Sequence, residues 1–369
     1  MRAHTRLEVN WATLAHNFEQ VKKLAPKARV LPMIKADAYG HGLLPVGRFL
    51  AEEIKAEAMG VATLAEGESL QQALPHYPGR IYVFSDTLVN EPKFHSRYAS
   101  KNLLPVIHDM ESLKTFLHDP CFKHLPLTIK LNTGMNRIGV DAENWEEMGR
   151  AIVKSGRKSI QHLMSHFARA ASEIKPDDKS HKQRAQFNEA LALFRGMGIA
   201  IEETSLANSG AIEQNFACDE TWVRPGLMLY GPWSYQGTTQ MVSSLITRVM
   251  KVFPVKKGTP IGYGTHVAGE DGVVAVLPIG YGDGFPTQST GHDFMINGEK
   301  ARVFGRVNMD MAFLFFNSSA LGKINVGDEV KFWEANPKTL IDWATHMNTH
   351  AYQALCGISA RVPRVYRIG

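Results

Sequence analysis

The chain of 369 residues has little cysteine, with three residues at long spacings, Cys121, Cys218 and Cys356. An odd number without a CxxC pair is unlike a disulfide framework or a structural zinc site. We expect Cys356, which lies among apolar residues, to be a small buried hydrophobe. No run reaches about 18 uncharged apolar residues, so we expect no membrane span.

An excess of charge of one sign is also missing. The 41 basic and 36 acidic residues leave a net charge of +5. The basic residues form no patch interleaved with aromatics, so we expect no nucleic-acid partner, whereas small anions such as phosphate or carboxylate suit the slight positive balance. The first residues lack the apolar run of a signal peptide, which predicts a cytoplasmic protein. His346 and His350 are four residues apart but lack the glutamate of HExxH and a third ligand, so we predict no metal.

Short apolar runs alternate with amphipathic stretches through the first 230 residues. This alternation is typical of a parallel sheet with helical crossovers, and eight units in this length predict an N-terminal (β/α)8 TIM-like barrel over residues 1–232. A doubly wound open sheet is the rival, because a count of strands does not show closure. No GxGxxG follows an early strand, which weakens a dinucleotide-binding version. The runs are Val30–Ile34, Met59–Thr63, Ile81–Phe84, Leu103–Ile107, Leu127–Leu131, Gln161–His166, Glu203–Leu206 and Trp222–Tyr230.

The pattern changes after Gly231-Pro232, where short β-rich runs are separated by Gly, Pro and Asn. We interpret residues 233–369 as a C-terminal, mostly antiparallel β domain with one helix at about Leu340–Met347. Residues 1–9, with the strand Glu8-Val9, are expected to pair with this second domain. The expected strands are Leu245–Phe253, Val273–Leu277, Ala301–Phe304, Ala312–Phe316 and Glu329–Phe332.

Polar residues directly follow several of the apolar runs, where a barrel places its active site. They are Lys35, Lys130, His166, Asn208-Ser209 and Arg224-Pro225-Gly226. Lys35 follows Leu31-Pro32-Met33-Ile34, and apolar neighbours lower the pKa of a lysine, which then can form a Schiff base with an aldehyde. A surface lysine at a strand end fits the local pattern equally well.

Several motifs together resemble those of bacterial alanine racemases. They come in the order of that family and cover nearly the whole chain. The matching segments are Ile34–Gly42 (IKADAYGHG), Lys130–Gly139 (KLNTGMNRIG), Ser165–Ala168, Asn208–Gly210, Val223–Gly231 (VRPGLMLYG), Gly262–Gly264, Gly280–Gly284 (GYGDG), Gly305–Asp310 (GRVNMD) and Arg361–Arg364 (RVPR).

The resemblance implies a pyridoxal 5'-phosphate enzyme with a barrel and a C-terminal β domain. Lys35 matches the lysine that holds the cofactor and, once freed, is a base on one face of the substrate carbon. Tyr263, in the second domain, matches the base on the opposite face. A tyrosine needs nearby positive charge for this role, and His166 and Arg224 match a network that links it to the cofactor. Judged alone, Tyr263 is more typical of an ordinary turn tyrosine.

Other matches concern the cofactor. Arg224 matches the residue facing the pyridine nitrogen, where an arginine weakens the ring as an electron sink and favours proton exchange over decarboxylation or transamination. A buried structural arginine is the alternative. The residues matching cofactor and phosphate contacts are Tyr39, Asn208, Ser209, Gly226 and Leu227. An ordinary turn or helix cap is the usual interpretation of Asn208-Ser209-Gly210.

Further matches concern the substrate. Arg137 matches the residue that contacts the substrate carboxylate, and Lys130 matches a lysine that is carbamylated in many members. Met309 and Asp310 match a loop reaching in from the partner subunit, which implies a homodimer with shared sites. Tyr281 matches an aromatic at the entry, and an ordinary tyrosine of a β-turn fits it equally well. The chain departs from common family residues at Asp37, Asn132 and Ala360, the last standing where some members have a phosphate-binding tyrosine.

The resemblance therefore implies an isomerase that interconverts L- and D-alanine with Lys35 and Tyr263 as its two bases, supplying D-alanine for peptidoglycan. A racemase of broader amino-acid specificity is the alternative within the fold. A non-catalytic pyridoxal-phosphate-binding barrel is disfavoured by the second domain with Tyr263. A decarboxylase of similar plan is disfavoured by Arg224.

Overall fold

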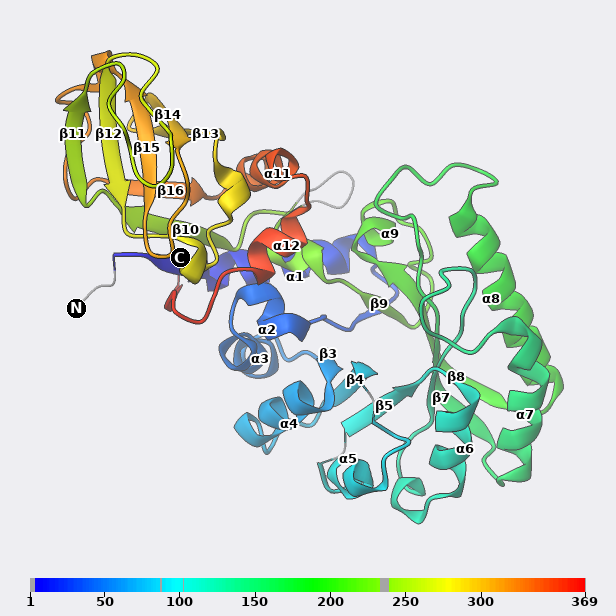
Figure 1. Cartoon of the computed structure of the whole chain (residues 1–369). Helices are drawn as coiled ribbons and strands as arrows, with labels where there is room; N and C mark the ends of the chain where they lie inside the picture. Colours follow the sequence, from blue (N-terminus) through cyan, green and yellow to red (C-terminus); the bar gives the residue numbers. More distant parts are fainter. Residues whose placement is uncertain (1–3, 87, 102, 233–238, 369) are drawn as a thin grey trace.

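The computed structural model describes residues 4–86, 88–101, 103–232 and 239–368 (Figure 1). It consists of a barrel with surrounding helices and a smaller β domain beside it. This confirms the predicted fold class. Of the N-terminal segment expected to pair with the second domain, residues 1–3 lie outside the described residues.

The barrel is built from one parallel sheet of eight strands in the order β2-β9-β8-β7-β6-β5-β4-β3. Its two ends meet through a bridge between Met33 and Gly60, where the Ile34 amide donates to the Gly60 carbonyl at 2.8 Å. This bridge excludes the open-sheet alternative. The strands are β2 (Arg29–Val30), β3 (Ala58–Thr63), β4 (Arg80–Asp86), β5 (Leu103–Ile107), β6 (Thr128–Lys130), β7 (Ser159–Met164), β8 (Ala200–Asn208) and β9 (Trp222–Arg224).

Helices surround the strands and begin at polar caps. Asn10 accepts from the Thr13 amide at 3.0 Å, and Thr63 and Glu66 form a capping box. Such caps satisfy amides that have no partner within the helix. The helices are α1 (Trp11–Leu24), α2 (Lys35–Gly40), α3 (Leu43–Glu52), α4 (Leu64–Ala73), α5 (His95–Lys101), α6 (Met110–His118), α7 (Trp145–Lys154), α8 (Lys179–Gly196), α9 (Ser209–Glu213) and α10 (Leu227–Tyr230).

The second domain contains two sheets, with strand orders β16-β10-β1-β17 and β11-β12-β15-β14-β13. Two helices, α11 (Pro337–His346) and α12 (Ala351–Cys356), follow the strand β16. Strands β1 and β17 pair in parallel, and the other pairs in these sheets are antiparallel. The strands are β1 (Arg6–Asn10), β10 (Ser243–Arg248), β11 (Lys251–Val255), β12 (Gly272–Leu277), β13 (Asp293–Ile296), β14 (Glu299–Phe304), β15 (Ala312–Asn317), β16 (Glu329–Trp333) and β17 (Arg364–Arg367).

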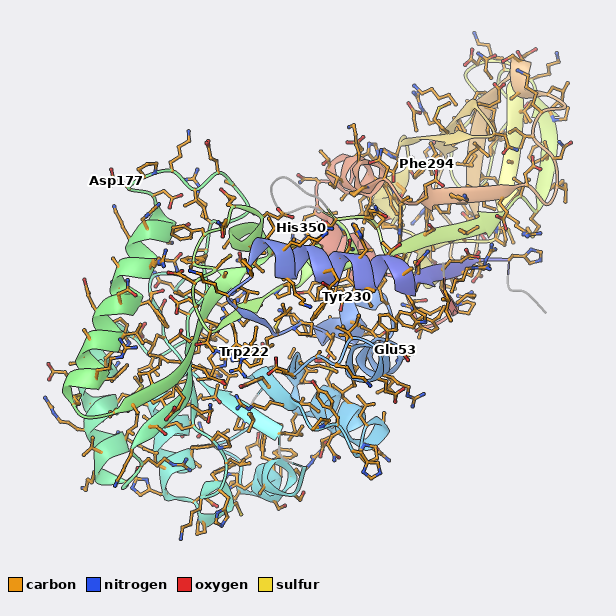
Figure 2. The ribbon with its side chains drawn as sticks, turned by 180° about the vertical axis from the view of Figure 1, so that it is seen from behind. Glu53, Asp177, Trp222, Tyr230, Phe294 and His350 are labelled. Carbon is orange, nitrogen blue, oxygen red and sulfur yellow. The ribbon has the colours of Figure 1, made fainter. Side chains whose placement is uncertain are left out.

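The N-terminal strand ties the two parts of the chain together. β1 lies between β10 and β17 of the second domain, and α1 follows it directly. Figure 2 shows α1 extending from the second domain along the barrel. On this helix, buried Asn17 donates to the Leu229 carbonyl at 3.0 Å and the Gln240 carbonyl at 2.8 Å, so it contacts the chain on both sides of the domain junction.

Three expected strands differ from those observed. In Trp222–Tyr230 the strand ends at Arg224, because Pro225 has no amide to continue the ladder, and Leu227–Tyr230 forms α10 instead. In Val30–Ile34 the regular strand ends at Val30, although backbone hydrogen bonds to the neighbouring strands continue through Met33 and Ile34. The run Leu245–Phe253 divides into β10 and β11, because its backbone passes from pairing with β16 to pairing with β12. The elements β13, β17 and α12 were not predicted.

Candidate active site

A cavity of about 240 Å³ lies where the barrel strands end. Lys130, Asn208 and Arg224 are the last residues of β6, β8 and β9, and His166 follows β7 closely. This is the end of a (β/α)8 barrel at which active sites lie. The lining residues are Met33, Lys35, Tyr39, Phe84, Ser85, Lys130, Arg137, Ile138, Met164, His166, Asn208, Ser209, Arg224, Gly226 and Tyr352.

Positive charge is concentrated in this cavity. Lys35, Lys130, Arg137 and Arg224 are among its lining residues, and none of the described residues that line it is acidic. Burial lowers the pKa of Lys35, and neighbouring Arg137 lowers it further. Burial lowers the pKa of Lys130 to about 7, with a further contribution from Arg224. The cavity is therefore suited to anionic ligands, and its surroundings favour the neutral, nucleophilic form of both amines more than water does.

Arg224 is held at the cavity by neutral acceptors. It is only 4% exposed. Its guanidinium donates to the Ser205 hydroxyl and the Ser165 carbonyl, and more weakly to the Leu206 carbonyl at 3.3 Å. Burial lowers its pKa to about 10, so it stays cationic at neutral pH.

His166 lies next to Arg224, with its Nδ1 3.5 Å from the guanidinium. Its Nε2 lies 3.4 Å from the Asn208 side-chain nitrogen. Burial and the charge of Arg224 hold the pKa of His166 well below its usual range. The imidazole is therefore neutral, with a nitrogen facing each of these two donors.

Hydroxyl groups gather at another part of the cavity. Ser209 Oγ accepts from the backbone amides of Gly226 at 3.0 Å and Met228 at 3.2 Å, which leaves its own proton available to a ligand. A Cβ on Gly226 would lie 2.3 Å from the Tyr39 hydroxyl, so only glycine allows this approach. Burial keeps the pKa of Tyr39 above its usual range, and the hydroxyl remains a donor. Such donors suit a phosphate.

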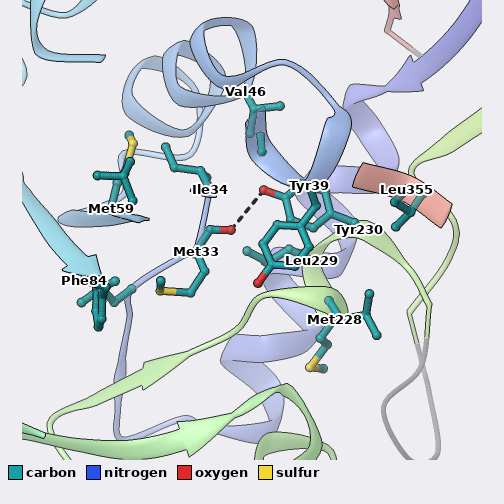
Figure 3. Close-up of a cluster of buried hydrophobic side chains, with 14 of the residues drawn as sticks. Met33, Ile34, Tyr39, Val46, Met59, Phe84, Met228, Leu229, Tyr230 and Leu355 are labelled. Atoms are coloured by element: carbon teal, nitrogen blue, oxygen red, sulfur yellow. Dashed lines mark hydrogen bonds between the residues drawn. The ribbon is translucent and has the colours of Figure 1, made fainter. Parts of the chain in front are cut away.

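Tyr39 packs among buried aromatic and aliphatic side chains (Figure 3). Its ring stacks on Tyr230 at 4.9 Å between centroids. The Tyr230 hydroxyl donates to the Met33 carbonyl at 3.2 Å, the interaction dashed in Figure 3. The wall behind the hydroxyl cluster is thus a packed core that fixes the position of Tyr39.

Directly after Lys35 the backbone takes a left-handed turn. Residues 36–39 have φ values between 53° and 55°. A left-handed residue that is not glycine costs about 1 kcal/mol or more, so the surroundings must enforce the turn. Glu66 accepts from the Ala36 amide at 2.7 Å, and Asp37 accepts from the Leu43 amide at 2.7 Å. Asp37, where the sequence departs from the common family residue, is therefore a structural acceptor that links the turn to α3.

The second domain contributes α12 to this side of the cavity. Tyr352 lines the cavity and lies tilted against Tyr39 at 5.8 Å. Sequence reasoning missed Tyr352, because nothing local marks its helix as lying beside the barrel. Arg364 of β17 donates to the Gly40 carbonyl at 3.0 Å, which holds the second domain against α2. Cys356, expected to be buried, is exposed, because α12 is a surface helix at that position.

Arg137 lies in a loop that Asn132 organises. Asn132 accepts from the amides of Gly134 at 3.1 Å and Asn136 at 3.0 Å, and donates to Asp141 at 2.6 Å. The amide side chain has both the donors and the acceptors that this loop requires. Asn132, which also differs from the common family residue, thus acts locally and orders the segment that carries Arg137 to the cavity.

The cavity brings together nine of the predicted site residues and leaves five elsewhere. Leu227 is buried at the start of α10. Four lie exposed on the second domain, with Tyr263 at 68% and Asp310 in an ion pair with Arg361 at 2.8 Å. The five are Leu227, Tyr263, Tyr281, Met309 and Asp310.

A larger hollow of about 640 Å³ lies at the opposite end of the barrel. There the buried carboxylate of Glu203 binds both Arg29 and Arg80, and the Arg29 guanidinium stacks 4.0 Å from the Trp222 ring. These two arginines therefore already have a carboxylate partner, whereas the acceptors of Arg224 in the cavity around Lys35 are neutral. The active sites of such barrels lie at the other end, so we interpret this charge cluster as contributing to stability.

No helix in the described ranges is long and apolar enough to cross a membrane. The same part of the chain brings no three histidine, cysteine, aspartate or glutamate residues together as a group able to hold a metal ion.

The fold and the cavity together define a (β/α)8-barrel enzyme with an appended antiparallel domain. Two family models match the chain, the alanine racemase N-terminal domain over residues 9–233 and the alanine racemase C-terminal domain over residues 242–366. The chain belongs to the alanine racemase family and is an isomerase.

Named relatives agree with this placement. The chain is 32% identical to an alanine racemase of Nitrosococcus oceani, over 96% of this chain and 97% of that protein. It is 33% identical to a catabolic alanine racemase of Pseudomonas putida, over 98% of each. The alanine racemase structure from Streptomyces lavendulae superposes with a TM-score of 0.88 at 26% identity, covering 100% of this chain and 98% of the other.

Proposed function

We propose that this chain racemises alanine with pyridoxal 5'-phosphate by a two-base mechanism. One observation carries the proposal: the cavity joins two lysines and two arginines to a cluster of hydroxyl donors, with no acidic residue among its described lining. An anionic cofactor and a substrate carboxylate supply the negative charge that such a cavity lacks.

The residues present fit this cofactor. Ser209, Tyr39 and the segment beginning at Gly226 would hold its phosphate, because the Ser209 and Tyr39 hydroxyls both face the cavity that Gly226 keeps open. The lowered pKa of Lys35 suits an amine that bonds to an aldehyde. Arg224 would face the pyridine nitrogen. When bound, the cofactor withdraws electrons from the substrate α-carbon and acidifies its proton.

Proton transfer then depends on bases at two faces of that carbon. Lys35, freed from the cofactor, takes or returns the proton on one face. Tyr263 serves the other face from the partner subunit, since in its own chain it is exposed and lies outside the cavity lining. Met309, Asp310 and Tyr281 are likewise exposed on the second domain and would approach the partner's cavity with it. The proposal therefore requires a homodimer with shared sites.

Lys130 fits a carbamate. Its side chain is buried and its pKa is lowered to about 7, so much of the amine is neutral and able to add carbon dioxide. The resulting anion would sit among the cations that now lower the pKa of the amine, and would hold Arg137 for the substrate carboxylate.

We place the reaction in the cytoplasm, where it would supply D-alanine to peptidoglycan.

Reduction with borohydride followed by peptide mapping tests the cofactor assignment. The cofactor should become fixed on Lys35, and a label on Lys130 or another residue would contradict it. A second measurement separates the two bases. Tyr263→Phe should slow deuterium exchange from solvent into one alanine isomer more than into the other, whereas equal loss for both would count against the assignment.

Mixing two inactive dimers tests whether the sites are shared. Lys35→Ala and Tyr263→Phe subunits should regain activity when they exchange, because one site of the hybrid has both bases. Lack of recovery, with exchange verified by mass, would place both bases in one chain. A racemisation assay over a panel of L-amino acids tests the broader-specificity alternative.

A further inference from the structure

His162 on β7 is a buried polar side chain that the proposed proton transfers do not use. Its Nε2 lies 2.7 Å from the Ser205 hydroxyl, and its Nδ1 has no hydrogen-bond partner in the described part of the chain. The ring packs edge-on against Tyr82 at 5.4 Å between centroids and lies 6.5 Å from Trp222 at an interplanar angle of 26°. The imidazole is therefore fixed in place, with the Ser205 hydroxyl as its hydrogen-bonding contact.

The Ser205 hydroxyl is shared between His162 and Arg224. The Arg224 guanidinium has only donors, so Ser205 Oγ accepts from it. The single hydroxyl proton then goes to His162 Nε2, which places the imidazole proton on Nδ1. This tautomer leaves only the Nδ1 proton without a partner among the described residues, whereas the opposite tautomer would leave both the Ser205 hydroxyl proton and the Nδ1 lone pair without one. Burial and the charge of Arg224 keep the pKa of His162 well below its usual range, which agrees with a neutral ring.

This arrangement matters because no carboxylate is among the hydrogen-bond partners that the described residues offer Arg224. Its guanidinium is positioned by a hydroxyl, by carbonyl oxygens and by the nitrogen of His166. A hydroxyl is a directed acceptor only when its own proton is engaged elsewhere. Without an acceptor behind it, the Ser205 proton could turn toward Arg224 and oppose it.

We propose that Ser205 and His162 are positioning residues for Arg224, forming the directed chain Arg224 to Ser205 to His162 across the neighbouring strands β9, β8 and β7. His162 acts as the terminal acceptor that orients the serine hydroxyl. This inference rests on the proposed function, because it concerns how Arg224 meets the pyridine ring of the cofactor.

Four variants of the intact holoenzyme test the chain. His162→Phe keeps an aromatic ring against Tyr82 and Trp222 but removes the acceptor. We expect kcat for alanine to fall about tenfold, with KM changed by less than about twofold, because a hydrogen bond to a charged group is weakened at the cofactor. The visible absorption of bound pyridoxal phosphate should shift, since Arg224 faces its ring. His162→Gln, whose amide oxygen accepts from Ser205, should restore both.

Ser205→Ala and the double variant supply the control. Ser205→Ala should lower kcat by a similar factor, and adding His162→Phe to it should change little, because His162 acts only through Ser205. The proposal would be overturned if the fold-losses in kcat of the two single variants multiply in the double variant. It would also be overturned if His162→Phe keeps the kcat and the absorption of the wild type. If His162→Phe does not fold, Ser205→Ala against Ser205→Thr, which keeps the hydroxyl, makes the same comparison. Failure of the proposed function is recognised separately, because the wild-type protein would then not racemise alanine.

Discussion

Replacing Lys130 with methionine should stabilise the protein at neutral pH, although it removes a side chain from the proposed site. Lys130 is only 6% exposed, and among its described surroundings Arg224, Arg137 and Lys35 are the charged groups that lower its pKa. Methionine has nearly the same length and no charge, so it fills the space without the unfavourable desolvation.

The size of the effect follows from the lowered pKa. The pKa falls from 10.5 to about 7 on folding, so the unfolded chain binds the proton more tightly than the folded one. The free energy of unfolding then rises with pH between these two values, and the destabilisation caused by the buried lysine is largest below about pH 7. It amounts to about 4 kcal/mol at pH 7 and about 2 kcal/mol at pH 9.

Urea unfolding in buffer free of carbon dioxide, repeated between pH 7 and 10, measures this difference. Lys130→Met should exceed the wild type most at pH 7, and the two should converge as pH rises. Adding bicarbonate should stabilise the wild type alone, because carbamylation consumes the neutral amine of the folded state. Lys154→Met, at an exposed position on α7, should change stability by less than about 0.5 kcal/mol at every pH.

Two results would refute the reasoning. If Lys130→Met is no more stable than the wild type at pH 7, the folded state does not disfavour the ammonium of Lys130. If the difference is present but independent of pH, its origin is packing and not the pKa. Stabilisation of Lys130→Met by bicarbonate would assign the carbon dioxide effect to another amine.

Three other outcomes are expected from the structure. Alkylation at pH 8 should label exposed Cys356 faster than Cys218, because burial raises the pKa of both thiols but raises that of buried Cys218 to about 12. Peptide mass spectrometry measures the two rates, and equal rates would contradict the burial of Cys218. Gly40→Ala should lower the melting temperature far more than Gly156→Ala. Both glycines have a positive φ, but only at Gly40 would a Cβ meet the backbone, 2.2 Å from the Leu355 carbonyl oxygen. Equal losses would mean that the backbone conformation alone causes the effect. Glu203→Gln should reduce the unfolding free energy by about 2 kcal/mol by weakening its bonds to two arginines, and an unchanged urea midpoint would refute this.

Sequence periodicity located the barrel strands well, because a strand buried on both faces is an uninterrupted apolar run. It failed where one run continued through a change of structure. At Pro225 the apolar pattern continues into α10, since both the strand and the helix there are buried. At Val249–Met250 it continues from one sheet into another. Apolar periodicity reports burial, and it does not report which partner supplies the hydrogen bonds.

The site was predictable where motifs are local. Lys35, Lys130 and Arg224 were found because each lies at or shortly after the end of a strand, and the barrel gathers strand ends. Tyr352 was missed because its helix reaches the cavity only through the packing of the second domain on α2. Ser205 and His162 were missed because they contact each other inside the barrel, between neighbouring strands. Nothing in the sequence of either strand shows that these two polar side chains meet.

The sequence by itself determined the alternation of strands and helices in the barrel, the class of fold and the identity of the strand-end residues, because these depend on local pattern and motif. The tertiary structure alone decided which of those residues meet. It closed the barrel at Met33 and Gly60, placed Tyr263 outside its own chain's cavity, and concentrated positive charge around Lys35 and Lys130. The physical reason is that pKa values and hydrogen-bond chains depend on burial and distance, which arise only when distant segments pack together.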